Sequence, residues 1–184
     1  EKNMALQEAE LLRKISHPYI VKFVDLVHQN KCLGLVMRYM EGGDMRTKIS
    51  HAAERNCALA ENDIWRWISQ MVSALKYLHS MRILHRDVKP ANIFLCSDDA
   101  VLGDLGIAKV LPHTGALALT RIGTPSYLAP EVWKGHFYSY AADVYSLGAF
   151  SFELAELHPP FTARSHELLA AQVVSKRLPP VIKG

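Results

Sequence analysis

The residues best suited to chemistry stand in one short run, residues 85–92, which reads His-Arg-Asp-Val-Lys-Pro-Ala-Asn. It places a carboxylate (Asp87), a cation (Lys89) and a carboxamide (Asn92) at fixed offsets. Phosphoryl transfer from a nucleotide uses such a set: the carboxylate takes the proton of the attacking hydroxyl, the cation neutralises the moving group, and the amide oxygen binds Mg²⁺. The run therefore indicates phosphoryl transfer, although a turn-capping Asp and a solvated Lys explain the same residues one by one.

A second oxygen ligand follows at Asp104, in the sequence Asp-Leu-Gly at the end of a predicted strand. Mg²⁺ is a hard cation that prefers oxygen ligands and keeps some of its waters. Asp104 and Asn92 would supply two such ligands. The simpler alternative for Asp104 is a turn residue ahead of Gly106.

Composition sets broad limits on the class of protein. The 184 residues are 49% hydrophobic and 21% charged, as in an ordinary globular domain. The net charge of +3 is too small to indicate nucleic acid or an acidic membrane surface as a partner. No apolar run reaches the roughly 20 residues that cross a bilayer. Three scattered cysteines favour a reducing compartment, so we expect a cytoplasmic protein, with nuclear or cytoskeletal association left open.

The elements that must position these residues change from strands to helices along the chain. A helix is expected over residues 4–15, where apolar residues recur at roughly helical spacing until a proline ends it. Two strands, 20–26 and 32–39, are rich in apolar and β-branched residues and form an antiparallel pair. Residues 42–44, Gly-Gly-Asp, form a turn.

Helices dominate the second half. A long helix is expected to begin at Glu61, among acidic and capping residues, and to present one apolar face. Short strands at 93–95 and 101–102 flank a turn formed by Ser-Asp-Asp, and an irregular loop follows. Two further helices are expected over 141–157 and about 165–175. Strands first and helices later is an α+β order.

Four motifs, in this order, resemble those of the protein kinases. Residues 85–92 are similar to the catalytic loop, and 104–106 to the magnesium motif with Leu in place of Phe. Residues 123–131 are similar to the substrate-docking loop that ends in Ala-Pro-Glu. Residues 143–148 resemble the start of the central helix of the large lobe. The resemblance implies the bilobal protein kinase fold.

The finer resemblance is to the NIMA-related Ser/Thr kinases. Residues 36–45 are similar to their hinge, and residues 107–109 and 158–161 also follow their pattern. Lys89 in the catalytic loop and the Gly-Thr-Pro run at 123–125 are features of Ser/Thr kinases, whereas tyrosine kinases usually differ at both.

The resemblance implies a role for each residue of the catalytic centre. Asp87 would accept or orient the proton of the substrate hydroxyl, and Lys89 would neutralise the transferring phosphate. Thr124 would bond both of them and help to select a hydroxyl substrate. Asn92 and Asp104 would hold Mg²⁺.

The resemblance also implies how ATP is bound. Met37 is similar to the gatekeeper, and Tyr39 and Met40 belong to the hinge whose backbone bonds adenine. Phe94 would lie below the purine ring, and Asp44 would meet the ribose or a basic group of the substrate. Without the motifs around them, Met and Phe at strand positions are usually core residues.

Three residues would regulate activity, by the same resemblance. Glu8 would pair with the lysine of the third strand of a kinase; the alternative is a solvated helix glutamate. Thr120 would carry an activating phosphate, added by an activating kinase or by autophosphorylation, which would dock on Arg86. The alternative is an unmodified loop threonine.

His85 is expected to be structural rather than an acid or base. By the resemblance it packs behind Leu105 in an apolar column that also contains Leu12 and Phe23. That column would link the two lobes.

The resemblance divides the chain as one partial kinase domain, truncated at both ends. Residues 1–38 would be the remainder of the small lobe, 39–44 the hinge and 45–184 an incomplete large lobe. The Gly-rich loop and the strand lysine of the family are absent from the sequence. We therefore expect these residues alone to have little activity and to aggregate readily.

The function implied for the parent protein is transfer of the γ-phosphate of MgATP to Ser or Thr of proteins, with no nucleic-acid or membrane partner. The alternatives are a pseudokinase or scaffold, and an inactive truncated fragment that acts by binding. A small-molecule or lipid kinase is disfavoured, because residues 123–131 would shape a peptide groove.

Overall fold

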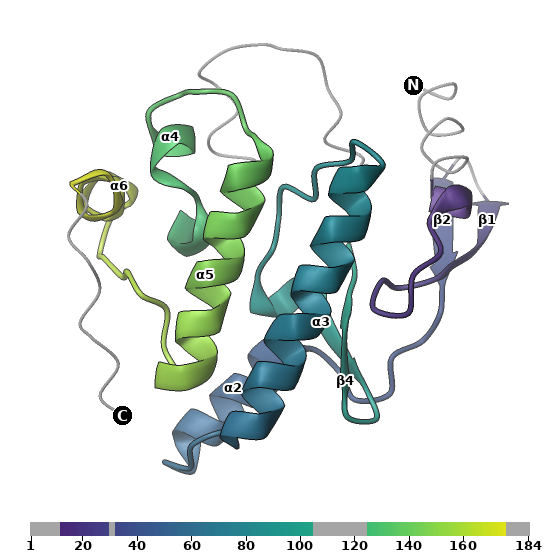
Figure 1. The fold of residues 1–184 in the computed structure, drawn as a ribbon, viewed down its shortest axis with the longest axis horizontal. Coiled ribbons are helices and arrows are strands. Elements are labelled where there is room, and N and C mark those ends of the chain that lie inside the picture. The colour runs from purple at the N-terminus through teal and green to yellow at the C-terminus, as the bar shows by residue number, and fades with distance from the viewer. Residues whose placement is uncertain (1–11, 30–31, 105–124, 176–184) are drawn as a thin grey trace.

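The computed structural model describes residues 12–29, 32–104 and 125–175, and the fold is that of these three ranges. Helices and two small antiparallel sheets confirm the expected α+β class. Figure 1 shows α3 and α5 side by side, with β1 and β2 at one edge and α6 at the other. In chain order the elements are β1 (Phe23–Gln29), β2 (Cys32–Met37), α2 (Met45–Glu54), α3 (Glu61–Ser80), η1 (Pro90–Asn92), β3 (Ile93–Cys96), β4 (Asp99–Leu102), η3 (Pro125–Tyr127), α4 (Pro130–Trp133), α5 (Tyr140–Glu156) and α6 (His166–Val174).

The first hairpin pairs β1 with β2 antiparallel, as predicted, with Phe23 opposite Met37 at one end. The residues before Phe23 take a different partner. The N–H of Val21 donates to the carbonyl oxygen of Leu102 at 2.8 Å, so this segment runs parallel to β4. The predicted strands were wrong by a few residues at these ends, because an apolar run does not specify which strand its backbone pairs with.

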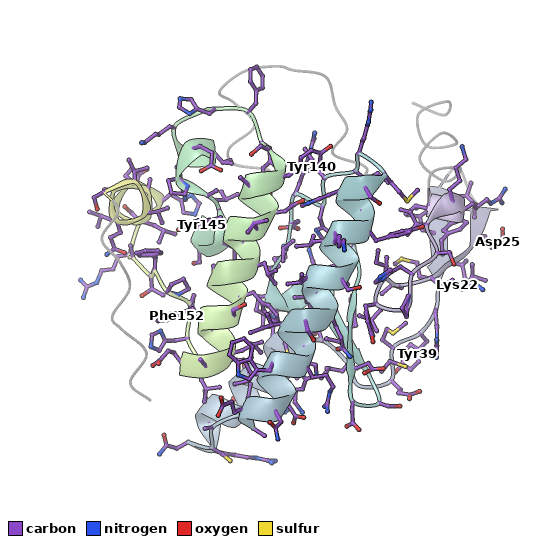
Figure 2. The ribbon with its side chains drawn as sticks, viewed as in Figure 1. Lys22, Asp25, Tyr39, Tyr140, Tyr145 and Phe152 are labelled. Carbon is purple, nitrogen blue, oxygen red and sulfur yellow. The ribbon has the colours of Figure 1, made fainter. Side chains whose placement is uncertain are left out.

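This hairpin has several exposed apolar side chains. Figure 2 shows Lys22 and Asp25 beside it, at the outer edge of the molecule. Its exposed apolar side chains are Val24, Val27, Leu35, Val36 and Met37.

Helix α3 supplies the central apolar face of the core. The helix begins at Glu61, as predicted, but its N-cap is Ala60, which makes no side-chain bond. The predicted capping was wrong because Glu61 and Asp63 lie inside the first turn, where they favour the helix dipole instead. The buried residues on the face that the spacing predicts are Trp67, Met71, Leu75 and Leu78.

The second hairpin, β3–β4, carries the predicted site residue Phe94 on one of its two faces. Its turn is residues 97–98, one residue shorter than predicted, because the next residue already pairs with β3. Ile93 and Leu95 face the main core with α3. Phe94 and Cys96 face the opposite side.

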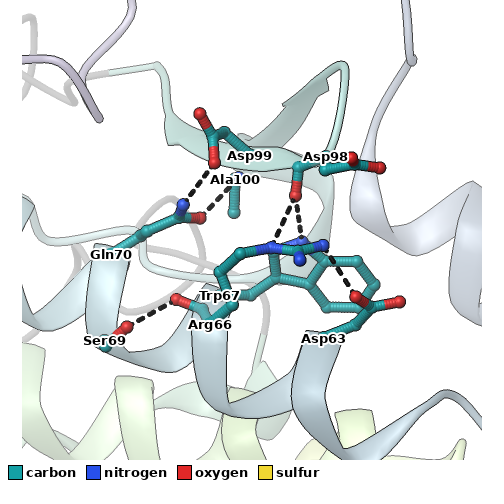
Figure 3. A network of polar contacts seen from close by, with 8 residues as sticks. All are labelled: Asp63, Arg66, Trp67, Ser69, Gln70, Asp98, Asp99 and Ala100. Carbon is teal, nitrogen blue, oxygen red and sulfur yellow. Dashed lines mark hydrogen bonds and ion pairs between the residues drawn. The ribbon is translucent and has the colours of Figure 1, made fainter.

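Helix α3 holds the turn of this hairpin through side-chain hydrogen bonds (Figure 3). Trp67 Nε1 and Arg66 Nε both donate to the backbone oxygen of Asp98, at 2.9 and 3.2 Å. Gln70 Oε1 accepts from the N–H of Ala100 at 2.8 Å. These bonds fix the position of the β3–β4 hairpin, and of the residues directly after it, relative to α3.

The sequence analysis missed two helices, α2 and α4. Asp44 caps α2, because its Oδ1 accepts from the N–H of Thr47 at 2.9 Å. Met45 and Ile49, four residues apart, form its buried face. Helix α4 is a single turn that begins at Pro130. The last two predicted helices correspond to α5 and α6, with bounds shifted by about one residue. Within the described ranges, no helix is long and apolar enough to span a bilayer.

Candidate active site

Asp87, Lys89 and Asn92 meet in the loop between α3 and β3. Lys89 Nζ donates to Asp87 Oδ2 at 2.8 Å, and Asn92 Nδ2 donates to the same oxygen at 3.0 Å. Asn92 Nδ2 also donates to the backbone oxygen of Asp87 at 2.8 Å. Pro90 opens the short helix η1, which turns the chain so that Asn92 returns to Asp87. The loop brings the carboxylate, the cation and the carboxamide into one hydrogen-bonded group.

His85 is fully buried behind this group. Its Nδ1 accepts from the N–H of Asp87 at 3.3 Å, so the ring proton lies on Nε2, which donates to the backbone oxygen of Gly103 at 3.0 Å. Burial lowers the pKa of His85, against the opposing charge of Asp143. The neutral ring therefore links the catalytic loop to Gly103, the residue before Asp104. These bonds support the structural role expected for His85.

Asp143 is a site residue whose role the sequence analysis missed. It is fully buried in the first turn of α5. Its Oδ2 accepts from the N–H of His85 at 3.0 Å and from His79 Nε2 at 2.8 Å. Its Oδ1 accepts from the N–H of Arg86 and from the hydroxyl of Tyr138, both at 2.9 Å. One carboxylate thus fixes the backbone of the catalytic loop.

The surroundings of Asp143 keep its donors in place. Burial, followed by the charge of Asp143, raises the pKa of Tyr138, so this hydroxyl stays protonated and donates. The sequence analysis placed Asp143 at the start of the motif 143–148 but gave its side chain no role. Its partners in the loop lie 58 and 57 residues away, which no local pattern indicates.

The donors around Asn92 and Asp104 fit Mg²⁺. Both hydrogen bonds of the Asn92 side chain use its nitrogen, which leaves the amide oxygen as a ligand. The backbone oxygen of Asn92 accepts from the N–H of Gly103 at 2.8 Å, which holds the exposed carboxylate of Asp104 at the same end of the hairpin. Among the described residues, no group of three His, Cys, Asp or Glu could hold a metal. Mg²⁺ commonly binds one or two protein oxygens together with phosphate, the number that Asn92 and Asp104 could supply.

The residues predicted to surround adenine divide into exposed and buried ones. Tyr39 is 83% exposed and Met37 45% exposed. Met40 is buried and packs in one cluster with Phe94. Phe94 also lies against Gly103: a Cβ there would come within 2.6 Å of its ring, so only glycine allows this approach. The Phe94 ring thus packs against the residue that precedes Asp104.

Three predicted site residues have notable backbone features. Asp44 uses Oδ1 to cap α2, and it lies opposite Phe94 in an isolated β-bridge, close to the predicted purine floor. Arg86 and Asp104 both adopt positive φ, 67° and 46°. Such angles are uncommon for these residues and cluster at functional sites.

The docking loop is anchored on α5 by a second buried acid. Tyr127 donates its hydroxyl proton to Glu153 Oε2, and Ser146 Oγ donates to the backbone oxygen of Tyr127 at 2.8 Å. Burial raises the pKa of both Tyr127 and Glu153, so Tyr127 remains the donor. Sequence reasoning identified this loop but missed its anchor.

Several predicted residues lie outside the described ranges. They are Glu8, Leu105, Thr120 and Thr124. The roles given to them stay predictions, as does the division of the chain into a small lobe, a hinge and a large lobe.

Comparison with known proteins matches residues 1–181 to the protein kinase domain family. The chain is 40% identical over 182 residues to the serine/threonine-protein kinase Nek1 of Mus musculus, with 98% of this chain and 15% of that protein covered. It is 40% identical over 181 residues to Nek2 of Homo sapiens, with 94% of this chain and 41% of that protein covered. It is 38% identical over 185 residues to Nek4 of Mus musculus, with 100% of this chain and 23% of that protein covered.

The chain therefore spans between 15% and 41% of the length of these relatives. The matches agree with the geometry of the catalytic loop and confirm the resemblance that its motifs indicated. The chain belongs to the protein kinase family, and its relatives there are serine/threonine-protein kinases of the Nek type.

Proposed function

We propose that the protein transfers the γ-phosphate of MgATP to serine and threonine hydroxyls of other proteins. The observation that carries the proposal is the group formed by Asp87, Lys89 and Asn92, joined by bonds of 2.8 to 3.0 Å and held from behind by Asp143. The names of the relatives, which are serine/threonine-protein kinases, favour the same chemistry.

Asp87 would receive the proton of the attacking hydroxyl. Its carboxylate is 8% exposed, and the bonds from Lys89 and Asn92 fix its orientation. In phosphoryl transfer, positioning of the nucleophile matters more than proton abstraction itself. A carboxylate that is already held needs no reorganisation when the substrate arrives.

Lys89 would contact Asp87 and the transferring phosphoryl group at the same time. Its Nζ has three protons, so it can keep the bond to Asp87 while another proton points to a phosphate oxygen. The Asn92 amide oxygen and the Asp104 carboxylate would hold Mg²⁺, which neutralises phosphate charge when it is bound. Phe94, packed on Gly103, would place the nucleotide above that carboxylate.

Activation by a phosphate on Thr120 remains part of the proposal. The N–H of Arg86 is fixed by Asp143, and the residue adopts a positive φ within the catalytic loop. A guanidinium whose backbone is held in this way suits a phosphate ligand. The described cysteines Cys57 and Cys96 are free thiols, which is in keeping with a cytoplasmic protein.

The test replaces Asp87 by Asn in the full-length protein and measures phosphate transfer from ATP to a protein substrate. We expect kcat to fall by about 10²–10⁴-fold, the range typical of a lost catalytic base, while the Kd for ATP changes little. Asp98→Asn is the matched control, because the described interactions of Asp98 use its backbone oxygen and not its carboxylate. Undiminished turnover in Asp87→Asn would reject the proposed role.

A further inference from the structure

A cavity of about 320 Å³ lies behind the hinge, outside the catalytic group. Three segments enclose it: residues 17–22, the hinge residues Arg38 and Met40, and the β3–β4 hairpin from Cys96 to Val101. No residue of the catalytic loop lines it. Its volume is at the lower end of the range for ligand sites.

The floor of the cavity is apolar. Ile20, Met40 and Val101 line it and are 4%, 8% and 6% exposed. Met40 and Val101 belong to the cluster against which Phe94 packs. An occupant would therefore touch the other side of the residues that position Phe94.

The rim of the cavity carries two exposed cations, Lys22 and Arg38. The N–H of Arg38 donates to the backbone oxygen of Lys22 at 2.9 Å, which holds the two residues side by side. Figure 2 shows Lys22 at the outer edge of the molecule. Across the described ranges neither side chain makes an ion pair, and the guanidinium of Arg38 contacts Cys96 Sγ at 3.7 Å.

One acid, Asp99, also lines the cavity and offsets only one of these two charges. Asp99 accepts from Gln70 Nε2 at 2.6 Å, within the network that holds the hairpin turn (Figure 3). His17 adds no charge: burial lowers its pKa, and its Nδ1 accepts from the N–H of Tyr19 at 3.2 Å. The rim is left with an excess of positive charge above an apolar floor.

We propose that this cavity is a docking site for an acidic peptide segment of a partner protein. An apolar side chain of the peptide would cover Ile20, Met40 and Val101, and flanking carboxylates would pair with Lys22 and Arg38. A small anion would satisfy the two cations but would leave the apolar floor exposed to water. A purely apolar peptide would leave the cations without partners.

The experiment uses the full-length protein and a fluorescent peptide, Glu-Asp-Leu-Phe-Glu-Asp, with its affinity measured by anisotropy. We expect Lys22→Glu and Arg38→Glu each to weaken binding about tenfold, because each reverses a charge at the rim. Lys22→Arg keeps the charge and should bind as the wild type does. Lys134→Glu is the matched control: Lys134 is exposed beside α4 and away from the cavity, so it should leave binding unchanged.

A second measurement locates the peptide. Cys96 lines the cavity, and exposed Cys57 does not, so the two thiols report on different surfaces. Bound peptide should slow the labelling of Cys96 by N-ethylmaleimide, read by mass spectrometry, and leave Cys57 unaffected.

Three results would overturn the proposal. The first is equal loss of binding in Lys134→Glu, which would show attraction to net charge only. The second is equal binding of the peptide Gln-Asn-Leu-Phe-Gln-Asn. The third is full competition by inorganic phosphate, which would show a plain anion site. None of these variants touches the catalytic group, so the outcome is independent of the test of Asp87.

Discussion

The catalytic loop differs in construction from the β1–β2 hairpin and the predicted hinge that follows it. Behind the loop, the side chains of His85 and of Asp143 from α5 are fully buried, and their hydrogen bonds fix successive backbone N–H groups. In β2, Val36 is 39% exposed, and in the predicted hinge after it Tyr39 is 83% exposed. One region is held from within, and the other presents its side chains outward.

The difference follows from what each region has to do. A group that receives a proton or orients a phosphate works only in one geometry, so its side chains need buried support. A hinge that bonds a purine through its backbone can leave its side chains free to vary. The contrast predicts large effects for substitutions behind the loop and small ones along the hinge.

The largest effect is expected for Asp143→Ala. It removes a buried carboxylate and leaves two backbone N–H groups, His79 and Tyr138 without their acceptor. We expect the free energy of unfolding to fall by about 3–5 kcal/mol, measured by urea titration with tryptophan fluorescence. Asp25 is exposed, pairs with Arg13 at 3.8 Å and accepts from the N–H of Leu26 at 2.8 Å, so Asp25→Ala should cost less than about 1 kcal/mol. Similar losses for both variants would show that the loop needs no buried support.

An intermediate effect is expected from His85 and appears as a dependence on pH. Burial lowers its pKa from 6.5, so below pH 6.5 the unfolded chain binds a proton that the folded chain does not. Stability is therefore complete above pH 6.5 and is lost as the pH falls below it, by up to about 1.4 kcal/mol per pH unit. Unfolding measured between pH 7.5 and 5 checks this.

The matched variant is His85→Gln, which cannot titrate but can still donate to Gly103. Its stability should depend less steeply on pH, and the slope that remains should include His17, whose pKa burial also lowers. If the slope of stability against pH were unchanged in His85→Gln, the titrating group would not be His85.

The smallest effect is expected at the hinge, for Tyr39→Ser. Because this side chain is 83% exposed, we expect the free energy of unfolding to change by less than about 0.5 kcal/mol. Met40→Ser is the comparison one residue away. Met40 is 8% exposed, so its replacement should lower the free energy of unfolding by about 2–5 kcal/mol, as other buried large-to-small changes do. Equal changes at the two positions would remove the contrast between them.

Local patterns were enough to predict much of this molecule. The apolar spacing of α3, the strand pairs and the four motifs each depend on residues close together in sequence. The group formed by Asp87, Lys89 and Asn92 was predictable for the same reason, since it spans a single loop. Helix α2 was missed although its cap Asp44 and its apolar pair Met45 and Ile49 were present, because the glycines before it indicated only a turn.

Long-range contacts could not be predicted in this way. Asp143 reaches the catalytic loop from a helix that begins 48 residues after Asn92, and Val21 bonds to a strand that lies far along the chain. Such pairs are set by how the helices pack and not by any local spacing. The grouping of Asp87, Lys89 and Asn92 was thus predictable from the sequence, and its support by Asp143 was not.

The bonds between Val21 and Leu102 and between Lys22 and Arg38 have a mechanical consequence. They join the two ends of the β1–β2 hairpin to each other and to β4. A rotation of β1 and β2 against the helices would therefore bend the chain close to Lys22 and Arg38. A ligand bound to these two residues would move little itself but would limit the movement of the hairpin turn.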